Sequence, residues 1–443
     1  MADKDKDNDE VEATIADEAV VIKYKTAGEI ANRVLVEIIE KCVEGASVRD
    51  VCIWGDNLIL EETSKVFKKE KEMKKGIAFP VCISANGCIC HFSPITSEPD
   101  HVIAKDDVLK IDLGVHLDGF ISMIAHTVVV GANADNKITD KKANCFLAAH
   151  YASQAALRLM RPGNDTYQIT DMVMKVCKEF DCKPVEGMLS HQLQQFKLDG
   201  PKTIIQNPSE SHRKEHEKAT IEANEVYALD VLVSTGTGAA RETTAKVSVF
   251  KKTEEVYPLK LRASRIFYTE VIQKHSIMPF NLRNFEDEKK AKMGVMECVN
   301  HKLIEPFQVL FEKTGETVVQ YKFTVLVTAT GPARITGLPF EEDLYVPNLS
   351  IKDPEILVCL INIHVNKIKL VSLTSLNSLI FTNFTTIYNN LLKTSVNQRG
   401  ILQPVKKKKK KPQKNANNAA GENCSMDVDQ SSKSGVEKME VDA

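Results

Sequence analysis

Cys88, Cys90 and His91 lie close together in the stretch CICHFSP, which ends at Pro94. Thiolate sulfur and imidazole nitrogen are the ligands that zinc prefers in proteins. A zinc finger also needs a second Cys or His pair at a defined spacing, and this stretch has none beside it. In an extended strand, Cys88 and Cys90 face one side and His91 faces the other. The spacing therefore favours two core thiols over a zinc site, and it leaves the role of His91 open.

Further motifs follow His91 in a defined order. After HFSP (91–94) come KIDLG (110–114), GMLSHQL (187–193), VYALDVLVSTGTG (226–238) and QYKFTVL (320–326). This ordered set resembles the type II methionine aminopeptidases and their relatives, over roughly residues 14–345. The resemblance implies an α+β pita-bread fold with a helical type II insertion at residues 262–310.

The resemblance also implies a reaction. In that family, two divalent cations about 3.5–4 Å apart activate a water molecule and polarise the carbonyl group of an N-terminal methionine. Several carboxylates are needed to hold two such ions so close together. The family supplies two Asp, one His and two Glu as ligands, and a separate histidine that faces the substrate. Three of these residues are matched in this chain: His91 corresponds to the substrate-facing histidine, Asp112 to the first aspartate and His191 to the ligand histidine.

Three other positions depart from the family. Met123 stands at or next to the second aspartate, Asp230 stands in place of a glutamate, and Lys322 replaces the last glutamate. The carboxylates of the family site are thus reduced to two, and the lysine adds a positive charge. An ammonium group between two dications would be repelled strongly even at an effective dielectric constant of about 20. We therefore expect Lys322 to pair with Asp112 or Asp230 and to fill the cavity, with no metal, no other cofactor and no peptidase activity.

Longer segments narrow the resemblance to one branch. FKKEKEMKKGIAFP, EGMLSHQL, KTIIQNP and GPARITGLPFEEDLY resemble the proliferation-associated, ErbB-receptor-binding proteins, which lack peptidase activity. This implies an RNA-binding protein of ribosomes and pre-ribosomal particles that regulates growth, translation and transcription in the cytoplasm, nucleus and nucleolus. Receptor kinase tails and transcriptional regulators are further implied partners. Two alternatives stay open: an active metal-dependent methionine aminopeptidase with unusual ligands, and a protein–protein adaptor whose pocket holds a peptide terminus.

The composition is compatible with a soluble intracellular protein. The chain has 443 residues, 43% of them apolar, and a formal net charge of −2, which fits one large domain or two ordinary ones. The start, MADKDKDNDE, lacks the apolar segment of a secretory signal. No stretch is apolar over the roughly 18 residues that a membrane span needs. We expect a monomer whose 11 cysteines, an odd number, are reduced thiols.

Strands and helices must hold the motifs in place. The spacing of Ile30, Val34, Ile38 and Ile39 predicts a helix, and Gly76 is expected to end a second helix over 65–76. Further helices are predicted over 140–160 and 167–180. Strands are predicted within 108–131, 225–238 and 321–331, the first as two segments joined through Gly114–Gly119. Because helices and strands mix without regular alternation, the pattern favours α+β.

Both ends of the chain are expected to lie outside the main domain. Residues 1–13 form an acidic tail that we expect to be disordered, the domain covers 14–350, and an extension covers 351–443. Residues 362–397 contain no Gly, Ala, Pro, Asp, Glu or Arg, and they include SLIFTNFTTIY (378–388), an aggregation-prone pattern. This insert has no counterpart in the branch. We hypothesise that it is translated non-coding sequence or a gene-model error.

Clustered lysines are the candidates for RNA binding or localisation, because they release counterions from a polyanion. The alternative for each cluster is an ordinary solvated surface or tail. No aromatic RNA-recognition motif is present, so we expect recognition through backbone charge and RNA shape. The candidates are Lys23, Lys25, Lys68, Lys69, Lys71, Lys74, Lys75, Lys289, Lys290, Lys292 and the run Lys406, Lys407, Lys408, Lys409, Lys410 and Lys411. In LVCLI (357–361), Leu357, Leu360 and Ile361 form a degenerate LxxLL motif for contacts with regulators, or are ordinary apolar core residues.

Overall fold

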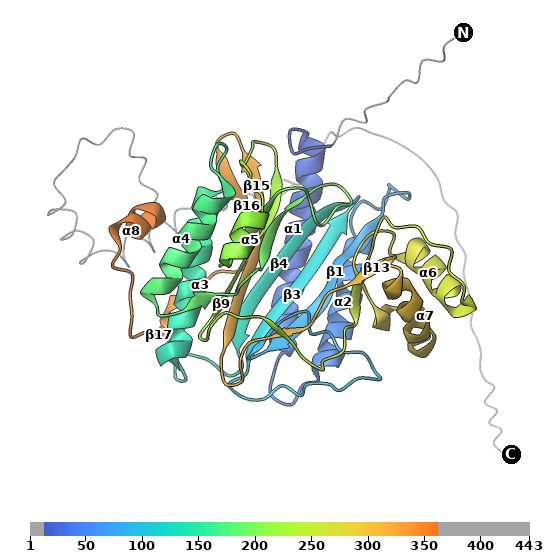
Figure 1. Cartoon of the computed structure of the whole chain (residues 1–443), viewed down its shortest axis with the longest axis horizontal. Coiled ribbons are helices and arrows are strands. Elements are labelled where there is room, and N and C mark those ends of the chain that lie inside the picture. Colours follow the sequence, from blue (N-terminus) through green and yellow to red (C-terminus); the bar gives the residue numbers. More distant parts are fainter. Residues whose placement is uncertain (1–12, 362–443) are drawn as a thin grey trace, which may run out of the picture. The chain divides into compact units, whose positions relative to one another are not determined.

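The computed structural model describes residues 13–361, and a nine-stranded sheet runs through the middle of them (Figure 1). The strand order is β1-β3-β4-β15-β9-β7-β8, with β16 paired to β15 and β6 paired to β9. Neighbouring strands of this sheet are antiparallel. The strands are β1 (Lys75–Ala85), β3 (Val108–Leu117), β4 (Phe120–Val129), β6 (Lys183–Pro184), β7 (Leu189–Leu193), β8 (Thr203–Ile205), β9 (Val226–Ser234), β15 (Val318–Thr328) and β16 (Gly331–Arg334).

Helices cover one face of the sheet. α1 (Glu18–Lys41) and α2 (Val48–Ser64) pack against β1, β3 and β4, while α3 (Asp140–Leu159) and α4 (Thr166–Glu179) cover β9, β15 and β8 (Figure 1). Asp17, Ser47 and Asp165 begin α1, α2 and α4 by accepting hydrogen bonds from first-turn backbone N–H groups. Every second residue of the central strands, such as Leu113 and Val231, is buried against these helices. The alternate residues therefore point to the opposite face, where polar side chains gather.

Shorter elements lie around this framework. β2 (Cys88–Cys90), β10 (Arg241–Glu242) and β14 (Leu310–Phe311) form a small sheet, and β5 (Ile138–Thr139) pairs with β17 (Tyr345–Val346). α5 (Glu210–Glu215) and η2 (Glu342–Leu344) are short helical segments. No helix within residues 13–361 is long and apolar enough to cross a membrane.

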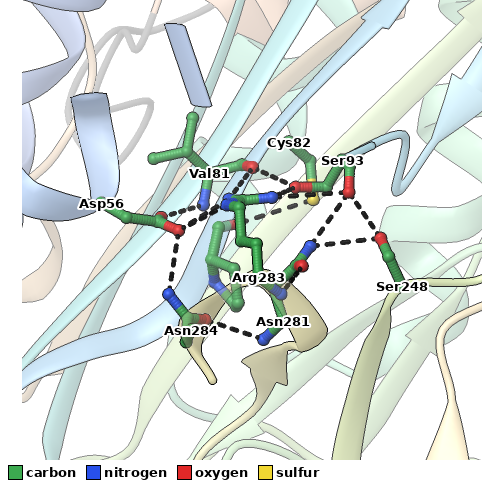
Figure 2. Close-up of polar contacts among 9 residues, drawn as sticks. Asp56, Val81, Cys82, Ser93, Ser248, Asn281, Arg283 and Asn284 are labelled. Atoms are coloured by element: carbon green, nitrogen blue, oxygen red, sulfur yellow. Dashed lines mark hydrogen bonds and ion pairs between the residues drawn. The ribbon is translucent and has the colours of Figure 1, made fainter. Parts of the chain in front are cut away.

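The predicted insertion is a subdomain of two helices and short strands. α6 (Arg262–Lys274) packs on α7 (Glu288–Asn300), beside β11 (Val249–Lys252), β12 (Phe280–Asn281), η1 (Leu282–Asn284) and β13 (Ile304–Pro306). Figure 2 shows how Arg283 of η1 joins this subdomain to the rest of the fold. Its guanidinium donates to Asp56 Oδ2 at 2.6 and 3.0 Å, to the carbonyl oxygen of Val81 at 3.0 Å, and to the hydroxyl of Ser93. The insertion is thus fixed to α2 and β1 by a buried ion pair.

Several predicted elements need correction. Residues 65–74 form turns rather than a helix, because α2 ends at Ser64 and β1 begins at Lys75. Lys23 and Lys25 lie within α1 rather than before it, since the helix starts at Glu18. Gly114 lies inside β3, and the turn to β4 is made by Asp118 and Gly119, which both have positive φ angles.

The packed unit extends beyond the boundary expected at residue 350. α8 (Pro354–Ile361) packs against α3 and α4, and its Ile356 and Leu360 are buried in the cluster that covers β9 and β15. Leu360 is only 4% exposed, so it belongs to the core rather than to a free LxxLL surface, while Leu357 and Ile361 are half-buried. Residues 1–12 and 362–443 lie outside the described part, and with them the acidic tail, the insert at 362–397 and the run Lys406–Lys411.

Candidate functional site

The sheet brings five predicted site residues onto one face. Asp112 lies in β3, Met123 in β4, Lys322 in β15, Asp230 in β9 and His191 in β7. Antiparallel partners lie on the same face of a sheet, and the pairings connect all five of these positions. Asp112 and Lys322 both lie opposite Ala125, Lys322 lies opposite Asp230, Met123 lies opposite Gly114, and His191 lies opposite Ala228. Together with His91, these residues are called the Lys322 site below.

The ammonium group of Lys322 lies between two carboxylates. Its Nζ is 2.6 Å from Asp112 Oδ2 and 3.1 Å from Asp230 Oδ2, and all three side chains are buried. The predicted pairing with one aspartate is therefore confirmed, and the structure adds the second. Gln320 Nε2 donates to both carboxylate oxygens of Asp230, at 3.0 and 3.1 Å. Asp112 Oδ1 has no hydrogen-bond partner within residues 13–361.

Burial and mutual attraction together raise the pKa values of Asp112, Asp230 and Lys322, called the ion triad below. Burial raises the pKa of both Asp112 and Asp230, against the opposing effect of the Lys322 ammonium. Burial acts to lower the pKa of Lys322, but the two carboxylates outweigh it and raise that pKa above its usual value. Lys322 is therefore charged at neutral pH, and it offsets one of the two neighbouring negative charges.

This arrangement does not fit a pair of divalent cations. The Lys322 ammonium occupies the space between Asp112 and Asp230, and a dication there would be repelled by it. Met123 offers a thioether rather than a carboxylate, and its side chain is packed with Phe79 in an apolar cluster. A Cβ atom at Gly114 would lie 2.5 Å from Met123 Sδ, which shows how closely the methionine covers the strand.

His91 is a neutral, packed imidazole. Its Nδ1 lies 2.9 Å from the carbonyl oxygen of Gln308, and its ring contacts the rings of Phe79 and Phe307. Because an N–H must face the carbonyl, Nδ1 carries the proton and Nε2 is the free acceptor. Burial lowers the pKa of His91 to about 4, and the charge of Lys322 acts in the same direction. The backbone φ of 65° at His91 is uncommon for a residue other than glycine, and it turns the chain away from β2.

His191 is half-buried and neutral, and its Nδ1 is buried. Burial lowers its pKa, and its Nδ1 has no hydrogen-bond partner in the described part of the chain. Together with Asp112 Oδ1, this makes two unpartnered polar atoms at one small site, although such atoms are rare in protein interiors.

Cys88 and Cys90 are buried free thiols beside His91. Burial raises the pKa of Cys88 to about 11, so the thiol is protonated at neutral pH. Within residues 13–361, no group of three or more His, Cys, Asp or Glu side chains is arranged to hold a metal ion.

Three residues that complete the Lys322 site, Gln320, Phe79 and Phe307, were not predicted from the sequence. Gln320 was overlooked, although it lies two positions before Lys322 and therefore faces the same side of β15. Phe79 and Phe307, which enclose His91, come from β1 and from the loop before β14, so no local pattern connects them.

The structure divides the basic candidates into free and paired groups. Lys23 forms an ion pair with Asp118 at 2.6 Å, and Lys25 is exposed on α1. Lys290 pairs with Asp287 and Lys292 with Glu98, whereas Lys289 is exposed. The turn region between α2 and β1, here called the basic loop (residues 65–74), is different. All five of its lysines are exposed, and Lys65 pairs with Glu61 and Glu62. The other four form no ion pair within the described residues: Lys68, Lys69, Lys71 and Lys74.

Comparisons with known proteins place the chain in a family of metallopeptidase-like proteins. Residues 22–258 match the model of metallopeptidase family M24. An "ERBB-3 binding protein 1" of Solanum tuberosum is 40% identical over 359 residues, which are 80% of this chain and 90% of the relative. The chain belongs to the ErbB-3-binding branch of metallopeptidase family M24. A "curved DNA-binding protein" of Schizosaccharomyces pombe is 39% identical and covers 79% of this chain and 92% of its own.

A solved structure supports the fold of this chain. A thermophilic Arx1 superimposes with a TM-score of 0.74 at 31% identity, over 78% of this chain and 98% of its own. The predicted α+β pita-bread fold is therefore confirmed. The resemblance to the peptidases implies metal-binding carboxylates at positions 123 and 322. In this chain, Met123 and Lys322 stand there instead, on the same face of the sheet.

Proposed function

We propose that this protein is a non-catalytic RNA- and ribosome-binding regulator of growth, translation and transcription, built on an aminopeptidase-like fold. The proposed lack of catalysis rests on the position of Lys322. Its Nζ lies 2.6 Å from Asp112 Oδ2 and 3.1 Å from Asp230 Oδ2. A two-metal hydrolase needs cations at that point to activate water, and a lysine ammonium activates no water there.

The basic loop supports RNA as the ligand. Lys68, Lys69, Lys71 and Lys74 are exposed and form no ion pair among the described residues. They outnumber the two exposed glutamates of the loop, Glu70 and Glu72, so its surface is cationic. The relative named for DNA binding is compatible with nucleic acid as a partner. We extend the proposal to ribosomes and pre-ribosomal particles, to receptor kinase tails and transcriptional regulators as further partners, and to the cytoplasm, nucleus and nucleolus as locations.

A three-part experiment tests this function on the full chain. We expect no bound divalent metal by elemental analysis, no release of methionine from a Met-peptide with added Co²⁺ or Mn²⁺, and RNA binding that weakens steeply with salt. Two equivalents of bound metal together with turnover would support the active peptidase instead.

Substituting the four unpaired lysines of the basic loop (Lys68, Lys69, Lys71 and Lys74) by alanine tests the location of the RNA surface. Each phosphate contact contributes about 0.7–0.9 to the slope of log K against log salt, so the slope should fall by up to about 3. Lys178 and Lys183 are exposed on α4 and β6, and their alanine variants serve as the matched control. An unchanged slope in the loop variant would place the RNA surface elsewhere.

A second candidate function rests on the two unpartnered polar atoms, Asp112 Oδ1 and His191 Nδ1. Both atoms are buried, so an adaptor that held a peptide terminus without cleaving it would have to open this site to expose them. Calorimetry with short Met-peptides distinguishes this candidate, because a non-cleaving adaptor binds the peptide and releases no product.

A further inference from the structure

A cavity separate from the Lys322 site lies between α2, the start of β1 and the insertion. Its volume is about 550 Å³, within the range of roughly 300–1,000 Å³ that is typical of ligand pockets. None of the six residues of the Lys322 site lines it. Leu60 and Ile53 of α2 line the cavity and are 48% and 37% exposed, so it is open to solvent.

The Arg283–Asp56 ion pair, whose contacts are drawn in Figure 2, involves two residues that line the cavity. Both side chains are less than 5% exposed, and their polar atoms are already bound to each other, to Val81 and to Ser93. Asn284 also donates to Asp56, at 3.5 Å. This wall is therefore rigid, and its charges are already paired.

Two imidazoles line the cavity. His275 is stacked on Phe280 and tilted against Phe285. Its Nε2, which has no partner within residues 13–361, is buried, so this ring offers a ligand in the cavity a flat surface rather than a hydrogen bond. His116 Nδ1 accepts a hydrogen bond from the backbone N–H of Gly119 at 3.4 Å. The proton of a neutral His116 ring is therefore on Nε2, which remains available as a donor. Burial lowers the pKa of both rings to about 4, so both are neutral at pH 7.

The charges that line the cavity do not favour an anionic ligand. Three cationic and three acidic side chains line it, so they balance: Lys75, Lys274, Arg283, Asp56, Glu286 and Glu288. Glu288 already accepts hydrogen bonds from the backbone N–H groups of Thr96 and Ser97. Neutral imidazoles beside apolar walls and carboxylates suit a flat, uncharged group with donors and acceptors along its edge. A nucleobase has this chemistry.

The cavity lining is balanced in charge, but the surface next to the cavity is cationic. Lys75 lines the cavity and directly follows the basic loop, so the four unpaired, exposed lysines of that loop precede it in the chain. The chain thus places a neutral, partly apolar cavity next to a cationic surface. Proteins that bind single-stranded nucleic acid combine these features, because the bases enter pockets or stack while the phosphates contact lysines.

We propose that this cavity holds one unpaired base of an RNA whose phosphates contact the basic loop. The inference rests on the proposed RNA binding and specifies its ligand, an RNA with a bulged or single-stranded nucleotide. A fully paired RNA reaches the basic loop only.

The test uses the full chain and two RNA hairpins that differ by a single unpaired nucleotide, 2-aminopurine. We expect the bulged hairpin to bind about tenfold more tightly than the paired hairpin, because stacking of one base contributes on that order. The fluorescence of the 2-aminopurine should also change on binding. Leu60→Trp fills the mouth of the cavity and should lower the affinity for the bulged hairpin to that of the paired one. Asn57→Trp, on the same helix wall, is a second filling variant in case the first does not fold.

Val36→Trp is the matched control, because Val36 is 41% exposed on α1 and does not line the cavity. Equal binding of both hairpins by the wild-type protein would overturn the cavity proposal and leave RNA binding intact. Equal losses for both hairpins in the filling variants would also overturn it. If neither hairpin bound, the proposed function itself would fail.

Discussion

Replacing Lys322 by methionine tests the ion triad directly. The substitution keeps the length and most of the volume of the side chain but removes the ammonium, so that Asp112 and Asp230 face each other without a cation. The three side chains are between 4% and 11% exposed, so water screens the remaining charges poorly. Removing one partner of a buried ion pair destabilises a protein by about 3–5 kcal/mol. We expect a decrease in the free energy of unfolding in this range at pH 7.

The loss should depend on pH in a defined direction. In the wild-type protein, burial already raises the pKa of both aspartates above the value of about 3.9 that they have in an unfolded chain. Without the ammonium these pKa values rise further, so the folded variant binds protons more tightly than its unfolded chain. The destabilisation is therefore full above the raised pKa values. It decreases as the pH falls through them towards about 4, because a protonated carboxyl has no charge to repel its neighbour.

Urea denaturation followed by the fluorescence of Trp54, the one tryptophan of the chain, measures the effect. Lys290→Met is the surface control, because Lys290 is 80% exposed in its pair with Asp287 and should contribute at most about 1 kcal/mol. A variant with K322M, D112N and D230N together removes all three charges and should recover most of the loss. If K322M were as stable as the wild-type protein between pH 5 and 8, the triad would not be the buried charge cluster described above.

Two further predictions concern the same sheet and α8. The combined variant M123D, D230E and K322E restores four carboxylates on the sheet face, counting Asp112. Calorimetry should then detect binding of Mn²⁺ or Co²⁺ that the wild-type protein lacks. Equal metal binding by the variant and the wild-type protein would contradict the electrostatic argument. Leu360→Ala should reduce the free energy of unfolding by about 2–5 kcal/mol, because its side chain is buried against α3, whereas the half-buried Leu357 should matter less. Equal, small effects of the two substitutions in urea denaturation would mean that α8 is not packed on the domain.

The sequence predicted the parts of the fold that depend on local pattern. The strands around Asp112, Asp230 and Lys322 and the helices α3 and α4 follow from periodicity, because their apolar residues face one layer of helices. The basic loop was predicted wrongly as a helix. Its lysines and glutamates favour helix, but it has too few apolar residues to pack one face against the core.

Contacts between distant segments could not be predicted in the same way. Arg283 and Asp56 are 227 residues apart, and nothing near either residue indicates that they form a buried pair. Lys322 pairs with both Asp112 and Asp230 because β15 lies between β9 and β4 in the sheet. Local sequence patterns do not predict that strand order. The family resemblance indicated which residues meet, but only the register shows that all of them lie on one face.

The ammonium between Asp112 and Asp230 also changes how this part of the sheet depends on its surroundings. A bound metal ion has a dissociation constant, so the fraction of molecules that hold it follows the supply of free metal and the strength of competing chelators. A cation that is part of a side chain is present in every molecule from synthesis onwards. The strands β3, β9 and β15 are therefore joined by a counter-ion that dilution, chelation or metal starvation does not remove.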